Sequence, residues 1–195
     1  MSPEFKRVTA LALANPHNRA VLEALPALVP NAWIVSGCVF QSVWNGLTGR
    51  EPSYGILDID VFYFDPDTSY EAEDAYIKAC DRAFAGLGVE VQVRNQARVH
   101  LWYPQKFGRP YPALTHATES LKYFLAPCCA VALRLGANGP ELEAPFGLED
   151  LLAMKVARNH LVEGSSQQYD AKSARWKAMW PEITVEPWDA VAPTP

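Results

Sequence analysis

The chain has 195 residues, of which 49% are hydrophobic and 20% charged, with a formal net charge of −5. This length allows one domain with a substantial core, and the acidic balance argues against a general nucleic-acid binder, which would normally be basic. No apolar run approaches the length of a membrane span. The four cysteines show no C-x-x-C spacing, so we expect a reduced, cytoplasmic protein without disulfides or structural zinc.

The first part of the chain predicts short helices alternating with buried strands. Pro16 separates two expected helices at residues 4–14 and 17–25. Residues 31–36 form a short strand, and Gly37 leads into an amphipathic helix with apolar side chains at helical spacing. Residues 48–55 carry glycines and a proline and are expected to form a loop. A strand then begins at Asp58, and residues 70–86 show the three-and-four repeat of a helix.

The second part begins with residues 89–103, which alternate clearly between apolar and polar side chains. The alternation predicts one long strand with a bend near Asn95, because this run exceeds the usual strand length. Further elements are helices at 116–125 and 147–159, a hairpin of 130–135 with 141–144, a linker at 164–168 and a last helix at 169–179. That helix is expected to pack Trp176 and Trp180 inward and to expose Lys172 and Arg175.

Together these elements predict an α+β fold around a mixed sheet. We expect a single domain over residues 1–195, with N-terminal helices at 1–30, a core at 31–160 and a C-terminal helix and tail at 161–195. Arg134 lies in an apolar strand of this core. A buried arginine requires an acidic or phosphate partner, so Arg134 is a secondary candidate for a functional residue.

Asp58 and Asp60 give the strongest functional signal in the chain. They lie one residue apart on the expected strand and point to one face, while Ile59, Val61 and Tyr63 point to the other. At about 6 Å and an effective dielectric of about 20, two such charges repel by roughly 3 kcal/mol. Hard divalent ions such as Mg²⁺ take carboxylate oxygens and leave room for phosphates. The pair predicts a metal–phosphate site; the alternative is two solvated acids at a strand end.

Two neighbouring elements support this prediction. The turn at Gly37 leads into a helix N-terminus, whose free N–H groups and dipole suit a phosphate. For Gly37 taken alone, an ordinary strand-to-helix connection is the favoured interpretation. The polar face of the long strand fits either a pocket for phosphates and a base or a solvent-exposed surface. That face carries Glu90, Gln92, Arg94, Gln96, Arg98 and His100.

The order of these elements resembles the nucleotidyltransferase superfamily with the polymerase-beta-like fold, and in particular a bacterial family of nucleotidyltransferase-like proteins of undefined substrate. The matching stretches are SGCVFQSVWN at 36–45, DIDVFYFD at 58–65, RNQARVHLWY at 94–103, APFGLEDL at 144–151 and RWKAMWP at 175–181. The resemblance implies a mixed, twisted sheet with helices packed on it. It implies transfer of a nucleoside monophosphate from a nucleoside triphosphate to an unknown small-molecule or protein acceptor, with Mg²⁺ or Mn²⁺ as cofactor.

The resemblance also implies a role for each candidate residue. Asp58 and Asp60 would bind the metal, and Glu90 would join them in catalysis by activating the attacking hydroxyl or completing a second metal site. The substrate-binding group would contact the phosphates or the acceptor and comprises Ser36, Gly37, Gln92, Arg98 and His100.

Two departures from the superfamily pattern leave alternatives open. The segment from Gly37 to Asp58 is longer than usual, which predicts a loop at residues 46–56 inserted over or beside the site. The usual third acid is replaced by Gln92, and Glu90 substitutes for it only if the strand shifts or bulges. A catalytically inactive nucleotide-binding or antitoxin-like interaction module of the same fold is therefore the first alternative. A glycosyltransferase with a D-x-D metal site is a weaker one.

Overall fold

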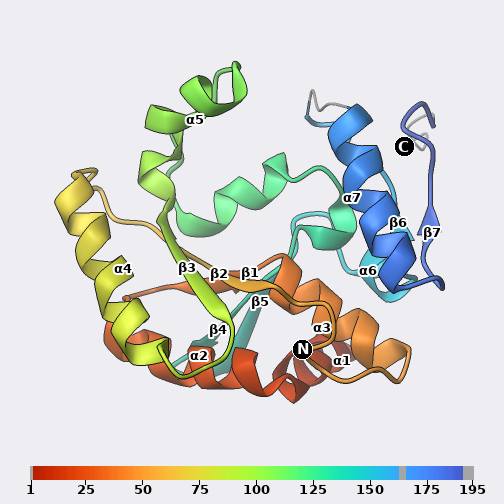
Figure 1. The fold of residues 1–195 in the computed structure, drawn as a ribbon, viewed down its shortest axis with the longest axis horizontal. Coiled ribbons are helices and arrows are strands. Elements are labelled where there is room, and N and C mark those ends of the chain that lie inside the picture. The colour runs from red at the N-terminus through yellow and green to blue at the C-terminus, as the bar shows by residue number, and fades with distance from the viewer. Residues whose placement is uncertain (1, 163–165, 191–195) are drawn as a thin grey trace.

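The computed structural model describes residues 2–162 and 166–190 and is built on a five-stranded mixed sheet (Figure 1). The strand β2 (Asp58–Tyr63) pairs parallel with β3 (Glu90–Asn95) and antiparallel with β1 (Trp33–Val35). On the far side of β1, the hairpin of β4 (Ala132–Gly136) and β5 (Gly139–Glu143) completes the order β3-β2-β1-β4-β5. The mixed sheet and the hairpin are as the sequence predicts.

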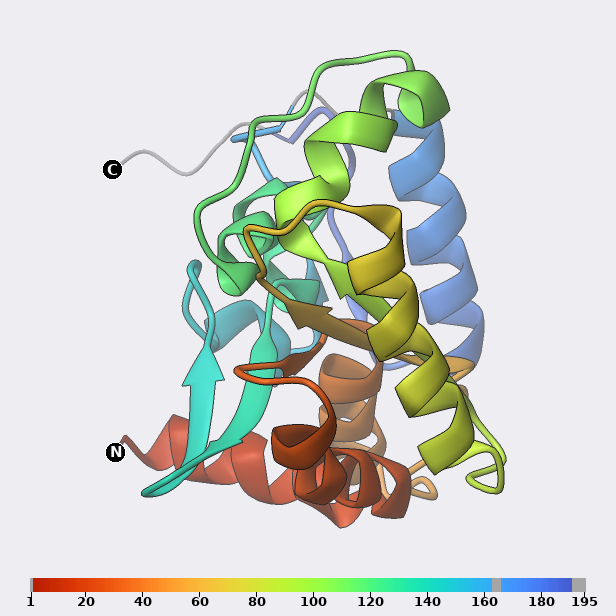
Figure 2. The same ribbon diagram turned by 90° about the vertical axis from the view of Figure 1, so that its left-hand side faces the viewer.

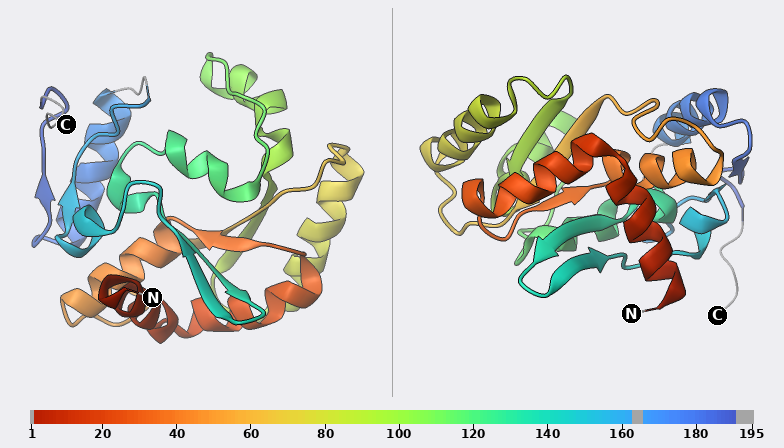
Figure 3. Two further views of the ribbon diagram at one scale, coloured as in Figure 1. Left: turned by 180° about the vertical axis from the view of Figure 1, so that it is seen from behind. Right: turned by 90° about the horizontal axis from the view of Figure 1, so that it is seen from below.

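Four helices pack on one face of this sheet. They are α1 (Pro3–Ala14), α2 (Pro16–Leu28), α3 (Gly37–Leu47) and α4 (Tyr70–Phe84). The right panel of Figure 3 shows α1 and α2 lying across this face, and Figure 2 shows α1 beside the β4–β5 hairpin. Ile59, Val61 and Tyr63 are buried in the core beneath these helices. The intervening Asp58 and Asp60 therefore point to the opposite face, as the alternation predicts.

Local capping explains why the first two helices begin where they do. The Ser2 hydroxyl accepts a hydrogen bond from the Phe5 N–H at 3.1 Å and caps α1. The Asn15 side chain caps α2 by accepting from the His17 N–H at 2.9 Å, and Pro16 occupies the first helical position, where no N–H is needed. Both expected helices are confirmed.

The predicted long strand at 89–103 is wrong in its second half. The strand β3 ends at Asn95, and the chain continues as η1 (Gln96–Arg98) and α5 (Val99–Phe107). The Asn95 side-chain oxygen accepts from the Ala97 N–H at 3.0 Å and from the Asp65 N–H at 3.1 Å. This side chain caps the turn and ends the strand, so the residues after it leave the polar face of β3.

The predicted helix at 147–159 is also wrong over most of its length. Its first residues form α6 (Glu149–Leu152), after which Met154 takes a positive φ of 53° and the chain enters β6 (Lys155–Val156). This strand pairs parallel with β7 (Thr184–Val185). The Tyr169 hydroxyl donates to the Val156 carbonyl at 3.0 Å, so contacts with the C-terminal segment, remote in sequence, override the local helical pattern.

The remaining helical elements include those on the face of the sheet to which Asp58 and Asp60 point. The expected helix at 116–125 is a 3-10 helix, η2 (Ala117–Tyr123), followed by η3 (Pro127–Cys129). The last helix, α7 (Ser166–Met179), begins inside the expected linker at 164–168, of which residues 164 and 165 lie outside the described part. Figure 1 shows α5 and α7 on the side of the sheet opposite α1 to α3. Among the described residues, no helix is both long and apolar enough to cross a membrane.

Candidate active site

Asp58 and Asp60 lie in a pocket of about 250 Å³ between the sheet, the start of α3 and the last helix α7. The turn into α3 contributes Ser36 and Gly37, and α7 contributes three residues. A second pocket of about 500 Å³ shares four lining residues with the first, namely Ser36, Asp60, Lys172 and Trp176. Asp60 therefore lies where two adjoining chambers meet.

The electrostatics of Asp60 are those expected for paired carboxylates with little solvent around them. Burial, followed by the neighbouring Asp58 carboxylate, raises the pKa of Asp60 from 3.8 to about 6, against the opposing effects of Arg94 and Lys172. The Gln92 Nε2 donates a hydrogen bond to Asp58 Oδ2 at 3.3 Å. A site that disfavours a second negative charge in this way favours a bound cation.

The turn from β1 into α3 presents backbone N–H groups to the same pocket. Ser36 holds a left-handed φ of 55° with ψ of −116°, and its N–H donates to the Val131 carbonyl at 2.8 Å. A non-glycine residue in such a conformation is strained, and such strain gathers at functional sites. The Val39 and Phe40 N–H groups both donate to the Ser36 carbonyl at 2.9 Å, which leaves the N–H groups of Gly37 and Cys38 as the donors without an acceptor within the helix. This helix end suits an anion.

The sequence analysis missed the cationic wall of the pocket, which α7 supplies. Lys172, Arg175 and Trp176 all line it, and their spacing of three and four residues places them on neighbouring faces of one helix. Trp176 packs edge-on against Phe40 of α3 with ring centroids 5.2 Å apart. Lys172 and Arg175 are exposed, as expected, and they also line the pocket. The i, i+3 and i+4 spacing with Trp176 is the signal that could have revealed this.

A buried hydrogen bond holds α7 against α3 and the predicted inserted loop. The Trp180 Nε1 donates to Asn45 Oδ1 at 2.9 Å, and the Asn45 Nδ2 donates to the carbonyls of Pro52 and Tyr54 at 3.1 and 2.9 Å. Gly55, with a φ of 71°, lies so close to Met179 that an added Cβ would approach its Cε to 2.0 Å. The loop lies beside the site, and its residues 55–57 line the pocket.

Two side chains at the pocket are buried with unpaired polar atoms. Within the described chain, the Gln41 Oε1 and the Trp176 Nε1 have no hydrogen-bond partner, although their residues are only 6% and 5% exposed. Both residues line the pocket with Asp58 and Asp60. Unpaired buried polar groups are costly, so they indicate a place where a polar ligand completes the hydrogen bonding.

The predicted third acid does not complete a metal cluster. Glu90 pairs with Asp58, and Gln92 pairs with Asp60, in the parallel register of β2 and β3, but Glu90 is exposed. The described residues contain no group of three or more His, Cys, Asp or Glu side chains arranged to hold a metal ion. Asp58 and Asp60 offer oxygen donors that fit one hard cation, with phosphate and water oxygens needed for the remaining positions.

Arg98 and His100 do not line the pocket that holds Asp58 and Asp60. With the strand ending at Asn95, Arg98 lies in η1 and forms an ion pair with Glu73 of α4, stacked 5.6 Å from the Tyr70 ring centroid. His100 lies in α5, and its Nδ1 is buried without a partner in the described chain. Ser36, Gly37, Asp58 and Asp60 are the predicted site residues that line the pocket. Glu90 and Gln92 do not line it but lie next to Asp58 and Asp60 on the adjacent strand, whereas Arg98 and His100 lie beyond the turn at Asn95.

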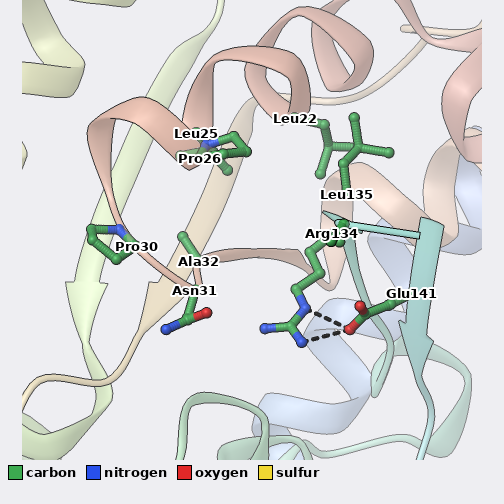
Figure 4. A pocket seen from close by; sticks show the side chains of 11 residues that line it. Leu22, Leu25, Pro26, Pro30, Asn31, Ala32, Arg134, Leu135 and Glu141 are labelled. Carbon is green, nitrogen blue, oxygen red and sulfur yellow. Dashed lines mark hydrogen bonds and ion pairs between the residues drawn. The ribbon is translucent and has the colours of Figure 1, made fainter. Parts of the chain in front are cut away.

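A separate pocket of about 450 Å³ lies between α2 and the β4–β5 hairpin, lined by Leu22 and Leu25 on one side (Figure 4). Arg134 borders it. Its Nε donates to Glu141 Oε2 at 2.7 Å, and its guanidinium lies 4.4 Å from the Trp33 ring centroid. The partner that the sequence analysis required for Arg134 is therefore Glu141, and the residue needs no phosphate.

Comparison with known proteins identifies the family and the fold. A family model described as "Nucleotidyltransferase" matches residues 25–185 of the chain. A solved structure whose description states that it "reveals a CCA-adding enzyme head domain" superposes with a TM-score of 0.74. It is 25% identical over 92% of this chain and 94% of that chain. The search of curated proteins found no match. The nucleotidyltransferase-like fold that the sequence predicts is confirmed.

Proposed function

Because the chain belongs to the nucleotidyltransferase family whose model it matches, we propose that it transfers a nucleoside monophosphate from a nucleoside triphosphate to an acceptor, using a divalent metal at Asp58 and Asp60. The observation that carries the proposal is the pocket itself, whose lining combines groups of both charges. It includes the acids Asp58 and Asp60, the cations Lys172 and Arg175, and Gly37 at the N-terminus of α3.

The pocket residues divide the work of binding. Lys172 and Arg175 attract the triphosphate, and the N–H groups of Gly37 and Cys38 donate to its oxygens. The unpaired Trp176 Nε1 supplies one more donor at the same pocket. Mg²⁺ or Mn²⁺, when bound, would neutralise charge on the transferred phosphoryl group. The backbone at the start of α3 is positioned before the substrate arrives, which lowers the cost of reorganisation.

Gln92 and Glu90, the neighbours of Asp58 on β3, have secondary roles in the proposed reaction. Gln92 holds the Asp58 carboxylate in place through its 3.3 Å hydrogen bond. Glu90, next to Asp58 on the adjacent strand, is the candidate base for the acceptor hydroxyl. Since Glu90 is exposed, it would act from the solvent side of the site.

Metal-dependent nucleotide binding and pyrophosphate release test the proposal. ATP should raise the melting temperature of the wild-type protein with Mg²⁺ but much less with EDTA. Asp60→Asn should abolish this difference and lower pyrophosphate release by at least a hundredfold. The exposed Asp81→Asn on α4 is the matched control and should behave as wild type. An Asp60→Asn variant with wild-type metal dependence would refute the assignment.

A second candidate function is a nucleotide-binding module without turnover. The absence of a third metal-holding carboxylate in the described chain, with Gln92 at that place, favours it. This candidate predicts that ATP stabilises the protein equally with Mg²⁺ and with EDTA, and that no pyrophosphate is released. The family match favours both of these candidates over the glycosyltransferase alternative.

A further inference from the structure

The second chamber, of about 500 Å³, differs in chemistry from the pocket that would take the triphosphate. Five aromatic side chains line it, drawn from α5, η2, the segment after η2, and α7. They are Tyr103, Phe107, Tyr123, Phe124 and Trp176. Such a volume is typical of small-molecule sites, and aromatic walls favour flat, apolar rings. The chamber therefore has the size and surface to hold a ring system.

The aromatic wall is organised rather than scattered. The Tyr103 ring lies 4.5 Å from both the Phe107 and the Tyr111 rings, and Tyr111 lies 5.2 Å from Tyr123, measured between centroids. The Arg109 side chain adds hydrogen bonds to the Tyr103 hydroxyl at 2.9 and 3.2 Å. These contacts hold the rings before any ligand binds, so little side-chain entropy is lost on binding.

The charge of the chamber depends on the state of Asp60. Its described lining residues include two cations, Arg109 and Lys172, and one acid, Asp60, at the junction with the first pocket. If Asp60 binds a divalent metal, this junction, which Lys172 also lines, carries a net positive charge. A polycationic ligand would then be repelled, whereas a neutral or anionic one would not.

We propose that the acceptor is a compact, ring-bearing molecule of zero or negative charge, which stacks in this second chamber and presents a hydroxyl at Asp60. This inference rests on the proposed function. An in-line attack comes from the side of the transferred phosphorus opposite the leaving pyrophosphate. The second chamber adjoins the first pocket at Asp60, so an acceptor bound there can approach a phosphorus held at that junction. The acceptor oxygen forms a bond to the α-phosphorus, and the bond from that phosphorus to the β-bridging oxygen breaks. The electron pair leaves with pyrophosphate, and the hydroxyl proton passes to solvent through Glu90, the proposed base.

Three indole probes that share one ring system and differ in charge test this inference. Tryptophol is neutral, indole-3-acetate is anionic and tryptamine is cationic, and each is titrated calorimetrically with Mg²⁺ but without nucleotide. We expect the first two to bind at least tenfold more tightly than tryptamine. 2-Cyclohexylethanol, which has no π-system, should bind more weakly than tryptophol. Equal or tighter binding of tryptamine, or of the cyclohexyl compound, would overturn the proposal.

Variants on α5 locate the binding. Phe107→Ala removes a chamber side chain and should weaken tryptophol binding at least threefold, whereas Leu101→Ala on the same helix lies outside the chamber and should have no effect. Both side chains are substantially exposed, at 41% and 51%, so neither change should unfold the protein. Equal effects of the two variants would contradict the assignment.

A final arm separates the acceptor from the donor base. Tryptophol is titrated again with ATP and Mg²⁺ at saturation. Unchanged or tighter binding supports an acceptor chamber, while competition means that the donor nucleobase fills it and refutes the acceptor assignment. A protein that binds tryptophol but shows no metal-dependent ATP binding refutes the proposed function and leaves the ring-binding chamber intact.

Discussion

Replacing Asp60 by asparagine should stabilise the metal-free protein at neutral pH. Burial and the Asp58 carboxylate raise the pKa of Asp60 from 3.8 to about 6, so ionised Asp60 is less favourable in the folded protein than in the unfolded chain. Asparagine has nearly the same shape and carries no charge. The variant therefore lacks the repulsion between the carboxylates of Asp58 and Asp60 that is present in the folded wild-type protein.

The magnitude follows from the pKa of Asp60 in the two states. A carboxyl with a raised folded pKa favours the folded state while it is protonated. That advantage is complete below about pH 3.8 and is lost as the pH rises to about 6. At about 1.4 kcal/mol per pH unit, the difference is about 3 kcal/mol. Asp60→Asn should therefore raise the free energy of unfolding by up to about 3 kcal/mol at pH 7.5, and by much less at pH 4.

Urea denaturation in EDTA at several pH values measures this effect. The gain from Asp60→Asn should grow between pH 4 and pH 6.5 and then level off, whereas Asp81→Asn should show no such growth. Adding Mg²⁺ should stabilise the wild-type protein more than the variant, because only the former keeps both carboxylates. A variant less stable than wild type at pH 7.5, or a gain that does not depend on pH, would refute the electrostatic reasoning.

Three further substitutions test the packing around the site by urea denaturation. Gly55→Ala should destabilise by at least about 1–2 kcal/mol through its positive φ alone, whereas Gly86→Ala, which meets no atom within 4 Å, should be nearly neutral. Trp180→Phe removes the buried indole donor to α3 and should cost roughly 1–3 kcal/mol. Glu73→Ala leaves the guanidinium of Arg98, whose side chain is 15% exposed, without its ion-pair partner and should cost about 3 kcal/mol, yet leave ATP binding unchanged.

The parts of the fold that local chemistry determines could be predicted from the sequence. Asp58 and Asp60 alternate with Ile59, Val61 and Tyr63, and the burial pattern of β2 follows that alternation. The first two helices follow from a proline and an asparagine at their boundary. In each case the signal lies within a few residues of the element that it specifies, so no distant contact was needed to interpret it.

The parts that distant contacts determine could not be predicted. The alternation through residues 96–101 is compatible with a strand. The strand ends at Asn95, however, because Asn95 forms hydrogen bonds with Asp65 and Glu73, which are remote in sequence. The orientation of α7 is a second case. Its amphipathic pattern distinguishes Trp176 from Lys172 but does not reveal that a pocket begins between them. Such contacts emerge only when the whole chain is assembled.

The supply of positive charge by α7 has a consequence for dissecting the protein. A fragment that ends before Ser166 would retain both carboxylates and the start of α3 but would lack Lys172, Arg175 and Trp176. Neither piece alone holds all the residues of the proposed triphosphate pocket. If the two pieces are expressed separately, neither should bind nucleotide alone. Binding should appear when they are mixed and reassociate, so the segment before α7 is a suitable place to split the protein.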